Sequence, residues 1–242
     1  MIARHAARTA ALLLAALAAA PARASEADAF ENKIPPISGQ LYPKAGRIEL
    51  TPGVSFSVND PFYAKTFGSL KLTWHITEFF SAGLAAAGGV ASATGSTTIC
   101  PANQGCGPAT EEQMRQVPGK IQWLAGVEGA FAPVYGKLNL SAELPVHFDL
   151  AVLAGADYIS YQKVVDAQTA AQGPPGNDSS VGGHVGLGMR FFFAGFMGLR
   201  FEVRDYLYTA KIGNTGESSL QNQLFVDLGL SFLFPTSARG GR

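Results

Sequence analysis

The chain has 242 residues, of which 47% are hydrophobic and only 15% are charged, and it contains 28 glycines and 16 phenylalanines. The hydrophobic content excludes a disordered chain, and the charged fraction lies well below the ~25% usual for soluble domains. The formal net charge is zero, so nothing in the composition indicates a nucleic-acid partner, and none is expected.

The N-terminal residues 1–24 have the parts of a secretory signal peptide. Arg4 and Arg8 come first, an apolar run follows over 10–20, and Ala-Arg-Ala at 22–24 matches the small-residue cleavage pattern. The run of 11 residues is too short for a membrane-spanning helix, which needs ~20. We predict export and cleavage after position 24, which leaves 15 basic and 18 acidic residues and a net charge of −3.

Residues 25–45 are polar and contain prolines, and we interpret them as an extended periplasmic arm. From Arg47 onward, apolar and polar residues alternate with a period of two. This period is strand geometry, because successive side chains of a strand point to opposite sides. Each segment is close to the ~9–11 residues that a tilted strand needs to cross a membrane. Eight such segments occur, at 47–58, 68–76, 80–90, 120–132, 146–158, 183–193, 197–207 and 220–234.

The connections between these segments alternate in length. Outer-membrane barrels have this asymmetry, with short periplasmic turns and long external loops. The segment 133–145 departs from it, because a short periplasmic turn is expected there; we expect it to hold a short helix or turn beneath the barrel. The other short connections follow the second and sixth segments, and the long ones lie at 59–67, 91–119, 159–182 and 208–219.

The polar face of the segments carries charged side chains of both signs. Six are acidic and four are basic, a balance that suits a sealed interior because buried charges must be paired. The remaining residues of this face are mostly glycine, alanine and serine, which fit the crowded interior of an eight-stranded barrel. We therefore expect the apolar face to meet lipid and a lumen charge network to form from Glu49, Lys71, Glu128, Asp149, Asp157, Arg190, Arg200, Glu202, Arg204 and Asp227.

Aromatic residues gather at both ends of the segments, and we expect two girdles at the membrane interfaces. The expected girdle at the short-turn end consists of Phe79, Phe80, Phe131, Tyr135, Phe191, Phe193, Phe232 and Phe234. The expected girdle at the loop end consists of Phe62, Tyr63, Phe67, Trp123, Tyr158, Tyr161, Tyr206 and Tyr208.

The last segment also resembles the C-terminal signal that the outer-membrane assembly machinery reads. Residues 235–242 follow it as a short tail. The predicted fold class is all-β, an eight-stranded antiparallel up-and-down transmembrane β-barrel over 46–234 in the outer membrane. The residues that match the assembly signal are Asp227, Gly229, Phe232 and Phe234.

Cys100 and Cys106 are the only cysteines, and both lie in the longest expected external loop. In an exported protein such a pair indicates a disulfide, which contributes roughly 2 kcal/mol in the chain-entropy model. We interpret His75, His147 and His184 as hydrogen-bonded residues of the polar interior. No catalytic residue, metal site or cofactor is expected.

Several sequence segments resemble those of one family: "NKIPPISGQLYPKAGRIELTP", "VYGKLNL", "HFDL" and "LAGA". They are similar to the outer-membrane β-barrel domain proteins of myxobacteria and related Gram-negative bacteria, over 31–234. Some similar barrels are linked to surface motility or envelope machinery, so the resemblance implies a scaffold role. It carries over no functional residue.

The expected function is a non-enzymatic envelope scaffold or interaction module with surface loops. Two alternatives stay open: a narrow pore for small solutes or ions, and a soluble exported lipocalin-like barrel that binds a small apolar ligand. An outer-membrane enzyme is disfavoured, because only His184 is placed near the loop end and no serine–histidine motif surrounds it. The expected partners are outer-membrane lipid, the barrel assembly machinery and other envelope proteins.

Overall fold

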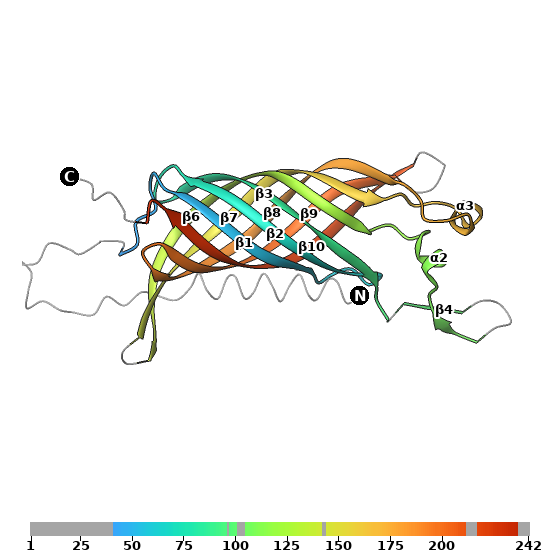
Figure 1. Cartoon of the computed structure of the whole chain (residues 1–242), viewed down its shortest axis with the longest axis horizontal. Coiled ribbons are helices and arrows are strands. Elements are labelled where there is room, and N and C mark those ends of the chain that lie inside the picture. Colours follow the sequence, from blue (N-terminus) through green and yellow to red (C-terminus); the bar gives the residue numbers. More distant parts are fainter. Residues whose placement is uncertain (1–40, 96, 101–104, 142–143, 212–216, 237–242) are drawn as a thin grey trace, which may run out of the picture. The chain divides into compact units, whose positions relative to one another are not determined.

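The computed structural model describes residues 41–95, 97–100, 105–141, 144–211 and 217–236. Within them, long antiparallel strands close into an eight-stranded barrel in the order β1-β10-β9-β8-β7-β6-β3-β2 (Figure 1). The predicted fold class, an eight-stranded antiparallel barrel, is confirmed. The strand bounds are β1 Ile48–Ser57, β2 Tyr63–His75, β3 Phe80–Ala93, β6 Ile121–Ser141, β7 Leu144–Gln162, β8 Asn177–Ala194, β9 Met197–Lys211 and β10 Ser218–Phe234.

The barrel closes because its first and last strands pair. Ile48 of β1 lies opposite Phe234 of β10, and Val54 lies opposite Leu228. This pairing removes the free hydrogen-bonding edges that an open sheet would leave.

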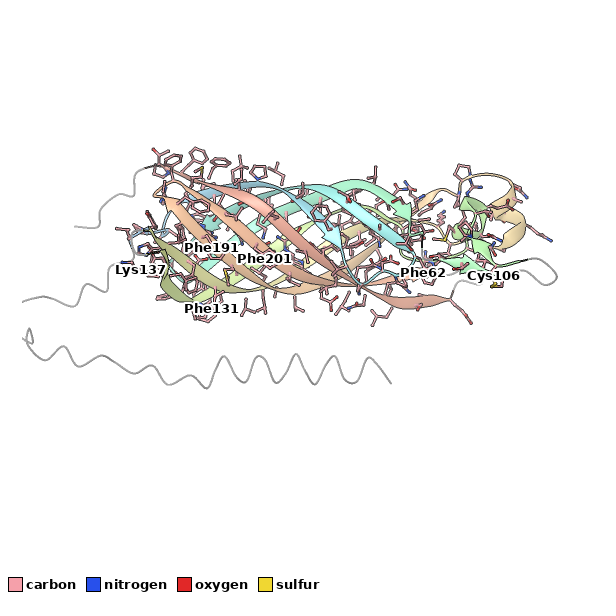
Figure 2. The ribbon with its side chains drawn as sticks, turned by 90° about the horizontal axis from the view of Figure 1, so that it is seen from below. Phe62, Cys106, Phe131, Lys137, Phe191 and Phe201 are labelled. Atoms are coloured by element: carbon pink, nitrogen blue, oxygen red, sulfur yellow. A yellow bond between two sulfur atoms is a disulfide. The ribbon has the colours of Figure 1, made fainter. Side chains whose placement is uncertain are left out.

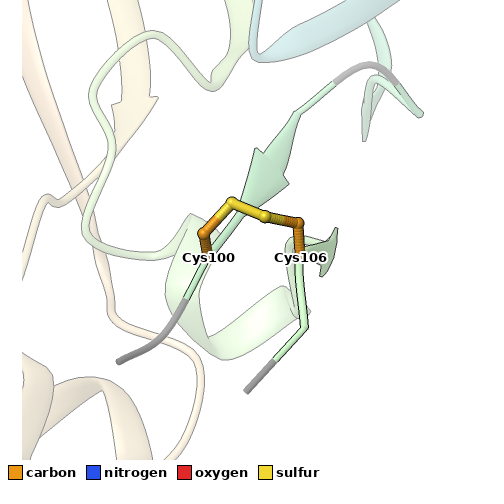
Figure 3. Close-up of a disulfide and its surroundings, with 2 residues drawn as sticks. All are labelled: Cys100 and Cys106. Carbon is orange, nitrogen blue, oxygen red and sulfur yellow. A yellow bond between two sulfur atoms is a disulfide. The ribbon is translucent and has the colours of Figure 1, made fainter. Parts of the chain in front are cut away.

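Short elements occupy the two longest connections, at one end of the barrel (Figure 1). They are β4 Thr98–Ile99, β5 Gly107–Pro108 and α2 Glu111–Met114 between β3 and β6, and α3 Ala167–Ala171 between β7 and β8. β4 and β5 form a separate two-stranded sheet, and the predicted disulfide Cys100–Cys106 joins their ends (Figure 3). Among the described residues, no helix has the length and apolar character needed to cross a membrane.

Side chains alternate between the interior and the outer wall. In β9, Arg200, Glu202 and Arg204 are buried, whereas Phe201 between them is 40% exposed. Large apolar side chains cover the outer wall on every side, as Leu70 at 52% and Leu228 at 43% exposure illustrate (Figure 2). A membrane-spanning barrel has this organisation, with charged groups inside and apolar groups outside. It contradicts the soluble lipocalin-like alternative, in which the apolar face would line the interior.

The expected long connection at 133–145 is wrong. β6 continues to Ser141 and β7 starts at Leu144, so the segment is a β-hairpin that extends past the neighbouring turns (Figure 1). The register between β6 and β7 shifts between Phe131 and Val134, where Pro133 lacks the N–H of a regular ladder. At this bulge, residues 132 and 133 of β6 lie opposite the single residue Ala151 of β7, and the two strands stay paired beyond it.

The expected loop at 59–67 is also too long. β2 starts at Tyr63 rather than at residue 68. The preceding turn is tight because the Asp60 carboxylate accepts hydrogen bonds from the backbone N–H groups of Phe62, at 2.8 Å, and Tyr63, at 3.0 Å.

The expected girdle at the loop end is wrong for most of its members. Phe62, Trp123 and Tyr158 are exposed on the outer wall. At the opposite end, aromatic side chains are exposed as expected at five positions: Phe79, Phe80, Phe131, Phe193 and Phe234. The loop-end residues that are buried instead are Tyr63, Phe67, Tyr161, Tyr206 and Tyr208.

Two glycines of β6 test which face of the strand is crowded. A Cβ atom on Gly126 would lie 2.3 Å from Asp157 Oδ1 and 2.4 Å from the Ala156 carbonyl oxygen, whereas one on Gly129 would have only the Ala154 carbonyl oxygen near it, at 3.9 Å. We expect Gly126→Ala to lower the free energy of unfolding by about 1–3 kcal/mol through overpacking, and Gly129→Ala to change it little. Urea unfolding of the refolded protein measures both; equal losses would contradict the inward orientation of Gly126.

Candidate functional site

The interior is the candidate site, and it has a charged layer and an aromatic layer. The charged layer holds the paired ions in the middle of the barrel and toward the short-turn end. The aromatic layer lies at the loop end, which Phe62 and Cys106 mark in Figure 2, and consists of Phe67, Tyr161, Tyr206, Tyr208 and Phe225.

Glu202 of β9 is at the centre of the charged layer. Its carboxylate accepts hydrogen bonds from Arg200 Nε and Arg204 Nη2 of the same strand. From β2 across the interior, Lys71 Nζ lies 2.7 Å from Glu202 Oε2. Three cations therefore converge on one buried carboxylate.

Lys71 also joins this cluster to β6. Its Nζ lies 2.7 Å from Glu128 Oε1, and Arg204 Nε lies 3.4 Å from Glu128 Oε2. Lys71 thus bridges two carboxylates on separate strands. The ion pairs connect β2, β6 and β9 across the interior.

Asp227 of β10 completes the middle of the layer. It accepts a hydrogen bond from Ser55 Oγ of the neighbouring β1, and its Oδ2 lies 3.7 Å from Arg204 Nε. The ion pairs therefore continue around the barrel to the strands that close it.

His184 of β8 is held by carboxylates at both ring nitrogens. Nδ1 lies 2.6 Å from Asp157 Oδ2, and Nε2 lies 3.1 Å from Glu128 Oε2. Within the described residues neither nitrogen contacts a serine, threonine or cysteine side chain, so the ring is not arranged to activate a nucleophile. The geometry is that of a hydrogen-bonded interior histidine.

Glu49 of β1 organises the charged layer toward the short-turn end. Its side chain is fully buried and contacts Arg190 Nη2 at 2.9 Å and Arg200 Nη1 at 3.1 Å. Ser231 Oγ donates to it at 2.6 Å, and His75 Nε2 lies 2.6 Å from its Oε2. Thr51 Oγ1 donates to it as well, at 3.0 Å, so this carboxylate has five partners on separate residues.

His147 lies at the same end, half-buried, and its contacts are aromatic. The Tyr135 hydroxyl is 3.1 Å from its Nδ1, and the Tyr42 ring packs edge-on against it with the centroids 5.4 Å apart. Tyr42 comes from the segment before the first strand.

That segment, residues 41–47, is a strap that covers the short-turn end of the barrel. Lys44 Nζ contacts Asp149 Oδ2 at 2.5 Å, and the backbone N–H groups of Lys44 and Ala45 donate to the Glu78 carboxylate at 2.9 and 3.0 Å. Arg47 Nη1 donates to the Gly195 carbonyl at 2.7 Å. Burial lowers the pKa of Lys44, and the Asp149 carboxylate opposes that shift.

The strap corrects part of the expected periplasmic arm at 25–45. Its last residues, from 41 onward, fold against the barrel end instead of extending away from it. The rest of the arm and the predicted signal peptide lie outside the described residues. A polar segment without strand periodicity gave no signal that Lys44 would enter the interior.

The aromatic layer closes the opposite end. The Tyr206 ring packs edge-on against the Phe225 ring, with the centroids 5.6 Å apart. The Phe67 ring also packs against Phe225, with the centroids 5.6 Å apart. Arg204 Nη1 donates to the Tyr206 hydroxyl at 3.1 Å, which joins the two layers. The alternation along the strand already indicated that Tyr206 and Tyr208 face the interior, because they share the strand face of Arg204.

Side chains fill the space between the layers. A cavity of about 20 Å³ remains, lined in part by Lys71, Glu202 and Asp227, and it has room for roughly one water molecule. An eight-stranded barrel has an interior that side chains just fill, and this one follows that rule. The arrangement is a polar plug with a closing layer at each end.

No protein-family model matches the chain, and no curated protein sequence matches it. Solved barrel structures do. The N-terminal β-barrel domain of Pseudomonas aeruginosa OprF is 8% identical, with a TM-score of 0.47, over 78% of this chain and 98% of that one. The outer membrane protein OprG of Pseudomonas aeruginosa is 13% identical, with a TM-score of 0.48, over 79% and 97%. Neisserial surface protein A is 9% identical, with a TM-score of 0.40, over 77% and 95%. These similarities concern the fold alone.

Glu202 tests how strongly the charged layer supports the fold. Glu202→Gln removes the carboxylate on which three buried cations converge, and we expect a loss of about 3–5 kcal/mol in the free energy of unfolding. Lys211→Gln is the matched control, because Lys211 Nζ pairs with Asp178 at 3.8 Å on the surface, where a pair contributes ~0–1 kcal/mol. Urea unfolding gives both values, and similar small losses would show that the layer is not stabilising.

Proposed function

We propose that this chain is an outer-membrane β-barrel protein that acts as a non-enzymatic scaffold or interaction module of the envelope. The observation that carries the proposal is the filled interior. Its charges are paired with one another, the strap and the aromatic layer close its ends, and its outer wall is apolar. Within the described residues, the charged layer leaves room for only about one water molecule, so we place the function on the outer surfaces and the loop end.

The outer membrane is the location that fits this architecture. The predicted signal peptide exports the chain, and a closed barrel satisfies all backbone hydrogen bonds of its wall within lipid. Outer-membrane lipid and the barrel assembly machinery are the proposed partners. In support of the assembly signal, β10 ends at Phe234, with Asp227 and Gly229 on its inner face and Phe232 and Phe234 on its outer face.

The sequence resemblance adds the finer part of the proposal. The sequence segments that carry the resemblance support membership in the family of outer-membrane β-barrel domain proteins of myxobacteria and related Gram-negative bacteria. A scaffold role in envelope machinery is what that resemblance implies.

The loop end is the proposed interaction surface toward other envelope proteins. It carries short ordered elements, β4, β5, α2 and α3, on connections that the barrel holds in place (Figure 1). The Cys100–Cys106 bond closes the short β4–β5 hairpin within one of these connections. Loops on a rigid scaffold are where recognition is commonly placed.

A narrow pore is the second candidate. It is favoured by the arginines that line the interior, Arg190, Arg200 and Arg204, and opposed by their carboxylate partners. An open path would require these pairs and both end layers to move. We therefore place the pore second.

The outer wall gives a test of membrane placement. Leu70 lies near the middle of β2 and faces outward, and Ala64 faces outward near the loop end of the same strand. In lipid vesicles, we expect Leu70→Arg to cost about 2–4 kcal/mol of folding free energy, and Ala64→Arg ~0–1 kcal/mol, because the cost depends on membrane depth. Urea unfolding followed by tryptophan fluorescence measures both; two small, equal effects would contradict a membrane at this wall.

Planar-bilayer recording separates the scaffold from the pore. We expect the refolded full chain to insert without discrete conductance steps, because side chains fill the interior. Heat-modifiable gel migration of the same sample shows that folded barrel is present. Reproducible openings of one amplitude would overturn the scaffold proposal in favour of the pore.

A further inference from the structure

One part of the barrel wall is incomplete at the loop end. β3 pairs with β2 to its last residue, Ala93, but pairs with β6 only as far as Gly88, which lies opposite Trp123. Residues 89–93 of β3 therefore have no β6 partner. β6 begins late because Gly119, at a φ of 110°, turns the chain just before it.

The segment 114–120 covers this gap. The Tyr63 hydroxyl donates to the Met114 carbonyl oxygen at 2.5 Å, and Arg115 Nη1 donates to the Ala170 carbonyl oxygen of α3 at 2.8 Å. Between the segment and β3 lies a cavity of about 260 Å³. Its lining includes Tyr63, Ser92, Met114, Arg115, Lys120 and Gln162.

This cavity is rich in hydrogen-bond donors and has no acidic residue in its lining. Arg115 and Lys120 are its cations, and neither forms an ion pair within the described part of the chain. Arg115 Nε is buried without a hydrogen-bond partner. Gln162 is 9% exposed, and it lines the cavity. Everywhere else in the interior, buried cations meet carboxylates or carbonyl oxygens.

Arg115 Nε is an unsatisfied buried donor, which costs free energy, and an anion within its reach removes that cost. Two cations with the Gln162 amide and the Ser92 hydroxyl beside them suit a phosphate group, which accepts several charge-assisted hydrogen bonds. This volume is more than ten times that of the one-water cavity in the charged layer, enough for a phosphate and the group that carries it.

The position of the cavity indicates what carries the phosphate. Val90, on the unpaired part of β3, is 70% exposed, and Trp123 at the start of the gap is 43% exposed, both on the outer wall. The cavity thus lies where the apolar wall ends at the loop end, which is the depth of headgroups in the proposed membrane. We propose that it binds the phosphate of an anionic lipid, with Arg115, Lys120 and Gln162 on the phosphate and the acyl chains along the wall near Val90.

Binding is tested with the refolded full chain in detergent micelles. Trp123 borders the gap, so its fluorescence reports binding once the other tryptophan is removed by Trp74→Phe. Dioctanoyl phosphatidic acid is the lipid probe, dioctanoyl phosphatidylcholine the zwitterionic lipid control, and inorganic phosphate the free-anion arm. We expect phosphatidic acid to bind at least ten-fold more tightly than either of the others, and more weakly as salt is raised.

Variants assign the binding to the cavity. Arg115→Gln combined with Lys120→Gln is expected to weaken phosphatidic acid binding at least ten-fold, and Gln162→Leu to weaken it by a smaller factor. Lys163→Gln is the matched control, because Lys163 is an exposed cation of the same end that does not line the cavity. Heat-modifiable migration of each variant shows that it is folded.

Two outcomes would overturn the proposal. Unchanged binding in the folded double variant would remove the site, and inorganic phosphate binding as tightly as phosphatidic acid would make the ligand a free anion instead of a lipid. The inference rests on the proposed membrane placement only for the lipid as the source of the phosphate. Failure of that placement would appear in the Leu70→Arg comparison, independently of these titrations.

Discussion

Each carboxylate sealed inside the barrel needs a cation within reach, and this requirement fixes how the strands lie against one another. Glu202 of β9 meets Lys71 of β2 across the interior, and Lys71 also meets Glu128 of β6. A shift of β9 by one residue would turn Arg200 and Arg204 toward the outer wall, at ~2–4 kcal/mol each near the middle of a membrane. The outer apolar face and the inner charges therefore select the same register.

The two-residue period predicted the strand number, their sequential order and the closed architecture, because alternation is a local property of a strand. The same period placed Arg200, Glu202 and Arg204 on one face. It could not predict that Glu202, rather than Glu49, would meet Lys71. Such pairings depend on strand tilt and stagger, which are set by the whole barrel.

The errors have specific physical causes. Tyr206 and Tyr208 were assigned to an outer girdle by their position along the strand, although they share the face of Arg204 and close the interior. The bulge at Pro133 interrupted the alternation, so a continuous hairpin was interpreted as a long connection. Lys44 precedes the periodic region, and only the tertiary structure brings it to Asp149.

The partners of the interior ions lie far apart in the chain: Glu49 and Arg200 are 151 residues apart, and Lys44 and Asp149 are 105 apart. A hairpin that forms early in folding therefore holds charges whose counterions are still far away along the unfolded chain. Such contacts must overcome a large loop-closure entropy before they contribute, and they form together when the ends of the sheet meet. The finished wall is consequently a single cooperative unit, and a fragment that lacks the last two strands would keep several ions without neutralisation.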